Sequence, residues 1–416
     1  MNYYHDRNIL SIDIKSFFAS AECINRGLDP FKVALVVADK ERGDGAMCIA
    51  ASPYLRSLGV NSRCRLFELP KNIDIIYAKP RMSLYTKVSN DVIDVYKEFV
   101  AEEDIHVYSI DEVFIDVTDY LNYYRKSDYE LAKDIMNRIK EKTGLTTTCG
   151  IGPNILLSKV ALDLEAKSSK DFIAKWTYKD VERKLWNISP LSELWGIGKN
   201  IEKKLNNLGI NKIGDINNYS RDFYIKRFGN VAGNEIWCKA NGIDFVSVKD
   251  RNKKPKEKSF NMSQILYRDY NTTETLLIIK EMVDMLCKRL RDNNKYTRKV
   301  YLKIKYSRDL EKDFYDTMRL EHASDNSREL YEVIRYLYEK HVEALPIRKV
   351  SISFSSLEER GANQLSLFDK DDMKSNEYYK IIDDIKLKYG AISLLKASSL
   401  LEESTIRNRE NFKNVI

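Results

Sequence analysis

The chain has 416 residues and a formal net charge of +7, with an isoelectric point of about 8.8. This length is too great for one hydrophobic core and predicts about two to four domains. The basic excess fits a polyanionic partner, and the lack of an apolar run of about 20 residues argues against a membrane span. The six cysteines have no paired spacing, which argues against zinc and disulfide frameworks and favours a reducing compartment.

The N-terminal half begins with an apolar strand, residues 9–14, that carries Asp13 near its end. A second apolar stretch, residues 105–117, contains Asp111 and Glu112 at its turn. Carboxylates that face each other across a sheet can hold two Mg²⁺ ions about 3.5–4 Å apart for phosphoryl or nucleotidyl transfer, because Mg²⁺ prefers hard oxygen ligands. Either cluster alone is more often a solvated turn, so the interpretation depends on both and on the rest of the chain.

Strands and helices alternate around these two clusters. The expected strands are 32–38, 46–51 and 146–151, and the expected helices are 17–23, 54–58, 81–99, 129–143 and 155–166. Asn154 is a suitable N-cap for the last helix. The alternation predicts an α+β sheet domain with helices on one face, interrupted by a compact insert.

A helical region follows, at about residues 170–243. Gly196 and Gly198 break one helix and start another at Lys199, and a Leu-Gly-Ile sequence ends it. This pattern indicates a helix-hairpin-helix, whose exposed backbone N–H groups suit a nucleic-acid phosphate. The alternative is an ordinary helical hairpin.

A second α+β unit is expected after a charged linker at residues 249–258. Its expected strands are 259–267, 299–306, 313–320 and 348–354, with helices 275–291 and 327–342. In strand 299–306 the apolar residues alternate with Lys303 and Lys305. A lysine-bearing sheet face suits a nucleic-acid backbone, and a solubilising outer face explains it equally well.

The C-terminal tail is polar except for an apolar island at residues 361–369, with its apolar cluster at 364–368, and an amphipathic segment at 383–401, for which we expect a helix. An apolar cluster between polar segments indicates a docking site. The alternative is a staple that pins the tail to the preceding domain.

These motifs resemble the Y-family DNA polymerases, the translesion group of the DinB/UmuC superfamily, and within it the UmuC-like branch of Gram-positive bacteria and their mobile elements. Residues 13–22 resemble the first metal motif, 108–116 the second, and 59–60 the end of a fingers motif. The resemblance covers nearly the whole chain. It implies a multidomain α+β fold like a right hand: palm 1–24 and 77–169, fingers 25–76, thumb 170–245, linker 246–258, little finger 259–357 and tail 358–416.

The resemblance also implies roles for individual residues. Asp13, Asp111 and Glu112 would be catalytic metal ligands, together with the backbone carbonyl of Ile14. The nucleotide would contact Phe17, the steric gate Phe18, Arg56 and Lys167, and the triphosphate tyrosine expected at Pro53 is displaced to Tyr54. The remaining implied contacts are to DNA (Gly196, Gly198, Lys199, Lys303, Lys305) and to the bacterial sliding clamp (Gln364, Leu365, Leu367, Phe368).

The implied function is low-fidelity, template-directed DNA synthesis with two Mg²⁺ ions, in translesion repair and the SOS response. The implied partners are primer-template DNA, deoxynucleoside triphosphates, the clamp β subunit and SOS accessory proteins. We expect a cytoplasmic, nucleoid-associated monomer with no signal peptide. Two alternatives are a non-catalytic scaffold that binds DNA and the clamp, and a nucleotidyl cyclase with a related palm.

Overall fold

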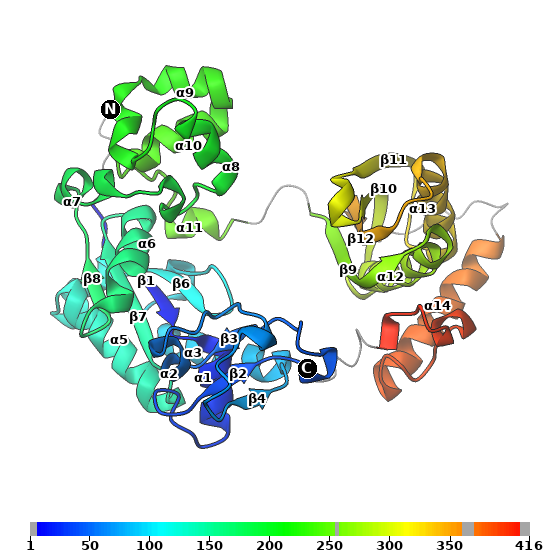
Figure 1. Cartoon of the computed structure of the whole chain (residues 1–416), viewed down its shortest axis with the longest axis horizontal. Coiled ribbons are helices and arrows are strands. Elements are labelled where there is room, and N and C mark those ends of the chain that lie inside the picture. The colour runs from blue at the N-terminus through cyan, green and yellow to red at the C-terminus, as the bar shows by residue number, and fades with distance from the viewer. Residues whose placement is uncertain (1–5, 254–257, 360–369, 408–416) are drawn as a thin grey trace. The chain divides into compact units, whose positions relative to one another are not determined.

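The computed structural model describes residues 6–253, 258–359 and 370–407, and for Arg42 and residues 370–377 only the backbone. The chain divides into two compact units, one that runs to Lys253 and one that begins at Lys254 (Figure 1). Each unit has its own hydrophobic core, as a domain of ordinary size requires. In the described part of the chain, no helix is long and apolar enough to cross a membrane.

A five-stranded sheet forms the centre of the first unit, in the order β5-β6-β1-β7-β8. Its strands are β1 (Ile9–Ile14), β5 (Ile105–Val107), β6 (Glu112–Asp116), β7 (Thr147–Gly152) and β8 (Ile173–Lys175). The central strand β1 pairs antiparallel with β6 and β7, and β8 pairs parallel with β7. Strand β8 corrects the prediction of a wholly helical region from residue 170, because three residues are too few to show strand alternation.

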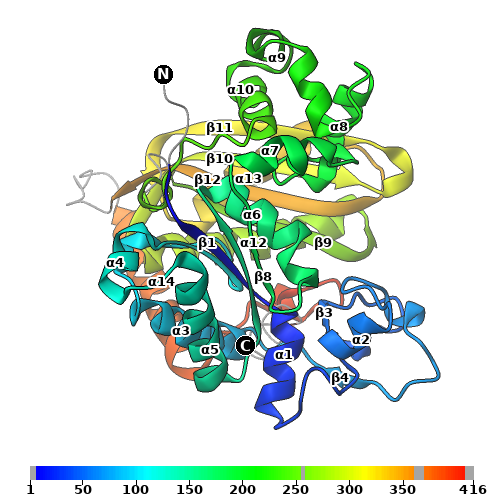
Figure 2. The ribbon, with the colours of Figure 1, turned by 90° about the vertical axis from the view of Figure 1, so that its left-hand side faces the viewer.

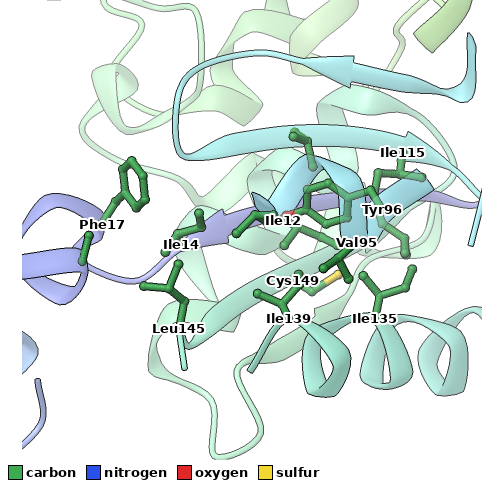
Figure 3. Close-up of a cluster of buried hydrophobic side chains, with 14 of the residues drawn as sticks. Ile12, Ile14, Phe17, Val95, Tyr96, Ile115, Ile135, Ile139, Leu145 and Cys149 are labelled. Atoms are coloured by element: carbon green, nitrogen blue, oxygen red, sulfur yellow. The ribbon is translucent and has the colours of Figure 1, made fainter. Parts of the chain in front are cut away.

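Helices cover both faces of this sheet (Figure 2). They are α1 (Phe17–Asn25), α3 (Met82–Lys97), α4 (Leu121–Tyr124), α5 (Asp128–Thr143) and α6 (Ile155–Leu164). In β7, Cys149 and Ile151 join the core formed with α3 and α5 (Figure 3), whereas Gly150 and Gly152 contact α6. Because successive strand residues point to opposite faces, α6 lies opposite α3 and α5. The prediction of helices on one face was wrong.

The insert between α1 and α3 has a small sheet and core of its own. Its strand order is β3-β2-β4. The elements are β2 (Leu35–Val37), β3 (Ala50–Ala51), α2 (Pro53–Ser57) and β4 (Ile76–Ala78).

A helical domain completes the first unit. It contains α7 (Lys179–Arg183), α8 (Lys199–Asn206), α9 (Arg221–Phe228), α10 (Asn230–Ala240) and α11 (Val248–Arg251). Helix α11 falls in the stretch expected to be a linker, yet it is attached to the edge of the five-stranded sheet. Lys249 pairs with Glu103 at 2.5 Å, and the Asn252 side-chain amide donates to the Ile105 carbonyl at 2.8 Å.

The second unit contains a four-stranded sheet in the order β11-β10-β12-β9, with two helices on one face. The elements are β9 (Phe260–Tyr270), α12 (Thr272–Asp292), β10 (Lys295–Tyr306), β11 (Asp313–Ser324), α13 (Ser327–His341) and β12 (Ile347–Glu359). Val300, Leu302 and Ile304 are fully buried, so the predicted alternation in this strand is confirmed.

The C-terminal segment packs against α12 of the same unit. It contains α14 (Lys370–Tyr389), which both begins and ends earlier than the helix predicted at residues 383–401. Asp383 forms an ion pair with Arg291 at 2.6 Å. Further on, the buried carboxylate of Glu281 accepts a hydrogen bond from the backbone N–H of Thr405 at 3.3 Å.

Candidate active site

Three carboxylates lie at one end of the β1–β6 pair. Asp13 and Glu112 are directly opposite each other in the ladder, and residues paired in this way point to the same face of the sheet. The Ile14 N–H donates to the carbonyl of Asp111 at 2.9 Å, which places Asp111 beside the end of β1. The structure therefore brings Asp13, Asp111 and Glu112 together.

The turn after β1 is tight. Ser16 has a left-handed backbone, with φ at 49°, a conformation that costs free energy for a non-glycine residue. The Ser20 N–H donates to the Ser16 carbonyl at 2.9 Å. Only Lys15 and Ser16 separate β1 from α1, and Asp13 and Phe18 line the same cavity.

A cavity of about 550 Å³ opens beside Asp13 and Asp111, a volume typical of small-molecule sites. The predicted site residues that line it are Asp13, Ile14, Phe17, Phe18, Arg56, Asp111 and Lys167. They come from β1, α1, α2, the turn before β6 and the segment after α6. The cavity is thus lined by carboxylates and by cationic side chains, and the Lys167 ammonium lies 3.9 Å from the Asp13 carboxylate.

The electrostatics of the carboxylates follow from their burial. The pKa of Asp13 is raised to about 7, because burial and the like charges of Asp111 and Glu112 outweigh the opposing charge of Lys167. Burial also raises the pKa of Glu112, against the opposing charge of Lys159. The lysine charges offset only part of the cost of burying these carboxylates, so a cation bound beside them would stabilise their ionised forms.

Helix α6 supplies Lys159, the cation that faces Glu112. Cβ atoms added at Gly150 and Gly152 would lie 2.1 Å and 2.4 Å from the backbone of Ser158, so only glycine permits this close approach of helix and strand. As a result, the Lys159 ammonium lies 2.9 Å from the Glu112 carboxylate, and both side chains are only 8 % exposed. Among the described side chains, no three histidine, cysteine or acidic residues are arranged to hold a metal ion, and Glu112 is turned toward Lys159.

The two adjacent phenylalanines have different surroundings. Phe17 is buried in the core (Figure 3), although its edge reaches the cavity. Phe18 is half-buried and stacks on Tyr85, with 4.6 Å between the ring centroids. The hydroxyl of Tyr85 donates to the buried Glu22 carboxylate at 2.8 Å. The Phe18 ring is therefore held rigidly at the cavity wall.

Helix α2 contributes Arg56 to the cavity. Ser52 caps this helix by accepting from the Leu55 N–H at 3.3 Å, and Arg56 is exposed in its last turn. Pro53 lines the cavity, whereas Tyr54 packs against the core of the insert. The proposed contact between Tyr54 and a triphosphate thus stays a prediction that this geometry does not favour.

The expected DNA contacts lie in two places. Gly196 has φ at 89°, and Gly198 precedes the first residue of α8, Lys199. In the second unit, Lys303 and Lys305 line a shallow cavity of about 200 Å³, and Lys303 pairs with Asp313 at 2.8 Å. The expected clamp motif, Gln364 to Phe368, lies outside the described residues.

The sequence interpretation missed several residues of this site. Lys15 and Arg63 line the cavity, and Tyr85 supports Phe18. Two residues of α6 were also missed: Lys159, which contacts Glu112, and Asp163, which contacts Lys167. The last two were detectable, because residues 159, 163 and 167 follow at intervals of four, which puts them on one side of a helix.

Comparisons with known proteins agree with this architecture. Residues 12–163 match the impB/mucB/samB family, 257–367 match its C-terminal domain, and 178–210 match the IMS family HHH motif. The fold is also similar to that of a solved Y-family DNA polymerase chimera, with a TM-score of 0.67 and 22 % identity over 84 % of this chain and 99 % of that one. The predicted multidomain α+β polymerase fold is confirmed.

Curated relatives are similar over almost their whole length. The "Putative UV-damage repair protein UvrX" of Bacillus subtilis (strain 168) is 36 % identical over 97 % of this chain and 96 % of its own. A "DNA polymerase IV 2" of Halalkalibacterium halodurans is 30 % identical over 97 % and 98 %. A "DNA polymerase IV 2" of Bacillus subtilis is 28 % identical over 95 % of both chains.

Proposed function

This chain belongs to the impB/mucB/samB family of Y-family DNA polymerases and is a DNA-directed DNA polymerase, and from that premise we propose that it extends primers across damaged template bases. The observation that carries the proposal is the cavity that unites Asp13 and Asp111 with Phe18, Arg56 and Lys167. Carboxylates beside cationic groups and an aromatic wall match the parts of a deoxynucleoside triphosphate: metal-bound phosphates, free phosphate oxygens and sugar.

Divalent metal ions fit the donor chemistry of this cavity. Asp13, Asp111 and the carbonyl of Ile14 supply hard oxygens, and substrate phosphates commonly complete the coordination of Mg²⁺. Glu112 would join them, although its carboxylate pairs with Lys159. Two Mg²⁺ ions bound here would activate the primer 3′-hydroxyl and stabilise the leaving pyrophosphate.

The protein side chains have separate tasks in the proposed reaction. Arg56 and Lys167 bind the triphosphate and neutralise charge that develops on it in the transition state. Phe18 lies under the sugar and excludes a 2′-hydroxyl. Because these groups act by position, the reaction depends on the rigid core behind the cavity.

The proposed DNA contacts do not read sequence. The helix-hairpin-helix at Gly196, Gly198 and Lys199 would bind backbone phosphates through N–H groups. Lys303 and Lys305 would bind phosphates through charge alone, so affinity should fall steeply with salt.

The proposal extends to recruitment and context. Gln364, Leu365, Leu367 and Phe368 would dock on the sliding clamp, with the apolar side chains as buried anchors. We further propose low fidelity, a role in the SOS response with accessory proteins, and a cytoplasmic, nucleoid-associated monomer. Changing Leu367 and Phe368 to Ala should remove stimulation by the clamp and leave basal synthesis unchanged. Loss of thermal stability would instead favour the staple.

One experiment separates the proposal from a non-catalytic scaffold. A primer annealed to a template with an abasic site is incubated with the protein, Mg²⁺ and deoxynucleotides, with and without the clamp. Extension past the abasic site, stimulated by the clamp, supports the proposal. A protein that binds this duplex without extending it would be a scaffold.

A further inference from the structure

Asp163 connects the two lysines of the active site. It lies at the end of α6, with Lys159 four residues before it and Lys167 four residues after it. Its carboxylate lies 3.0 Å from the Lys159 ammonium and 2.8 Å from the Lys167 ammonium. One carboxylate thus binds both cations.

Each of these lysines also approaches a carboxylate of the site. Lys159 lies 2.9 Å from Glu112, and Lys167 lies 3.9 Å from Asp13. The charges therefore alternate along a chain of contacts: Glu112, Lys159, Asp163, Lys167 and Asp13. Such a chain couples the position of each group to that of its neighbours.

Burial differs along this chain of contacts. The Lys159 side chain is 8 % exposed and is fixed by its two carboxylate partners, whereas Lys167 is 43 % exposed at the cavity. A lysine side chain has a flexible four-carbon stem and three donor hydrogens. A partner that orders the stem and leaves donors free reduces the ordering cost of binding a phosphate. Asp163, at 30 % exposed, is placed to do this.

We propose that Asp163 is a positioning residue for nucleotide binding, which holds Lys167 at the cavity. This inference rests on the proposed function, because it requires Lys167 to bind the triphosphate. Asp163 touches neither substrate nor metal in this role.

The test measures binding, not turnover. The dissociation constant of the correct deoxynucleotide is measured with Mg²⁺ on a primer-template whose primer ends in a dideoxynucleotide, so no bond can form. Asp163→Asn keeps the shape of the side chain, Asp163→Glu keeps its charge, and Lys167→Ala removes the proposed phosphate contact. Asp292→Asn is the matched control, since Asp292 pairs with Lys288 at the same four-residue spacing on α12.

We expect Asp163→Asn to weaken nucleotide binding about 5–10-fold by misplacing Lys167, and Lys167→Ala to weaken it about 10–100-fold. The double variant should match Lys167→Ala, since Asp163 acts through that lysine. Asp163→Glu should recover most of the affinity, and Asp292→Asn should bind like the unchanged protein.

Two results would overturn the inference alone: wild-type affinity of Asp163→Asn beside a weakened Lys167→Ala, or a double variant whose losses multiply. Wild-type affinity of Lys167→Ala would overturn both this inference and the triphosphate role assigned to Lys167.

Discussion

The two main sheets of this protein differ in how deeply they bury their charged side chains. In the first unit, α6 covers the face that carries Glu112, so this carboxylate and Lys159 are almost completely buried. In the second unit, the helices cover the apolar face of β10, and on the opposite face Lys303 is half-buried and Lys305 is exposed. Buried charges interact strongly and are fixed in position, as groups that take part in a reaction must be. Exposed charges are screened by salt and are adaptable, which suits a grip on any DNA sequence.

The largest effect should follow from removing the carboxylates of the first sheet. Changing Asp111 and Glu112 together to Ala should reduce nucleotide addition by about 1000-fold or more. In the proposed mechanism, these carboxylates hold the metal ions on which bond formation depends. Duplex affinity should stay nearly unchanged, since these residues do not hold the backbone. Asp13→Ala should behave alike. Single-turnover extension by the double variant at a rate within about tenfold of the unchanged protein would show that the site lies elsewhere.

The packing of α6 on the first sheet can be disrupted at Gly150. A methyl group there would lie 2.1 Å from the Ser158 carbonyl oxygen, so Gly150→Ala must displace α6. We expect a loss of about 3 kcal/mol or more in the free energy of unfolding, with lower activity because Lys159 leaves Glu112. Urea unfolding measures this, and Gly45→Ala is the control, because a Cβ at Gly45 meets no atom within 4 Å. Equal stabilities would mean that α6 tolerates a looser contact.

The preference for deoxynucleotides over ribonucleotides tests whether Phe18 is held rigidly at the cavity wall. Phe18→Ala should lower the preference for deoxynucleotides over ribonucleotides about 10–100-fold, because the ring that stacks on Tyr85 no longer fills the space at C2′. The ratio of kcat/KM values for the two sugars measures it. Phe17→Ala should instead destabilise the core by about 3–5 kcal/mol. If Phe17→Ala relaxes the selection and Phe18→Ala does not, the roles of the two rings are exchanged.

The smallest effect is expected on the exposed sheet. Changing Lys303 and Lys305 to Ala should reduce the slope of log affinity against log salt by about 2, one for each phosphate contact. Catalysis at saturating DNA should be preserved. Lys288→Ala, on α12 at the other face of the sheet, should leave the slope unchanged. An equal slope for the double variant would mean that this face contacts only solvent.

Much of the fold was predictable because its patterns are local. Strand alternation places Val300 and Ile304 inward, and helical spacing identifies α3 and α5. The sequence also predicts that the carboxylates of Asp13, Asp111 and Glu112 face each other, and the antiparallel pairing of β1 with β6 explains it: the end of β1, with Asp13, lies beside the start of β6, with Glu112.

The rest depends on contacts between distant segments. Gly150 and Gly152 carry no side chain, so no hydrophobic pattern reports that α6 packs against them. The ion pair of Lys159 with Glu112 joins residues 47 positions apart and needs that packing first. The sequence predicts a linker at residues 249–258 because this stretch is charged and contains a proline. Helix α11 is held there by Lys249, whose partner Glu103 is distant in the sequence.

The C-terminal segment has a practical consequence for studying the clamp motif. Deleting everything after residue 359 would remove the motif. It would also remove Asp383, the ion-pair partner of Arg291, and Ser404 and Thr405, which donate hydrogen bonds to the buried carboxylate of Glu281. Withdrawing a donor from a buried carboxylate costs about 1–3 kcal/mol. A truncated protein that no longer responds to the clamp would therefore be ambiguous between a lost docking motif and a damaged second unit. Point substitutions at Leu367 and Phe368 avoid that confusion.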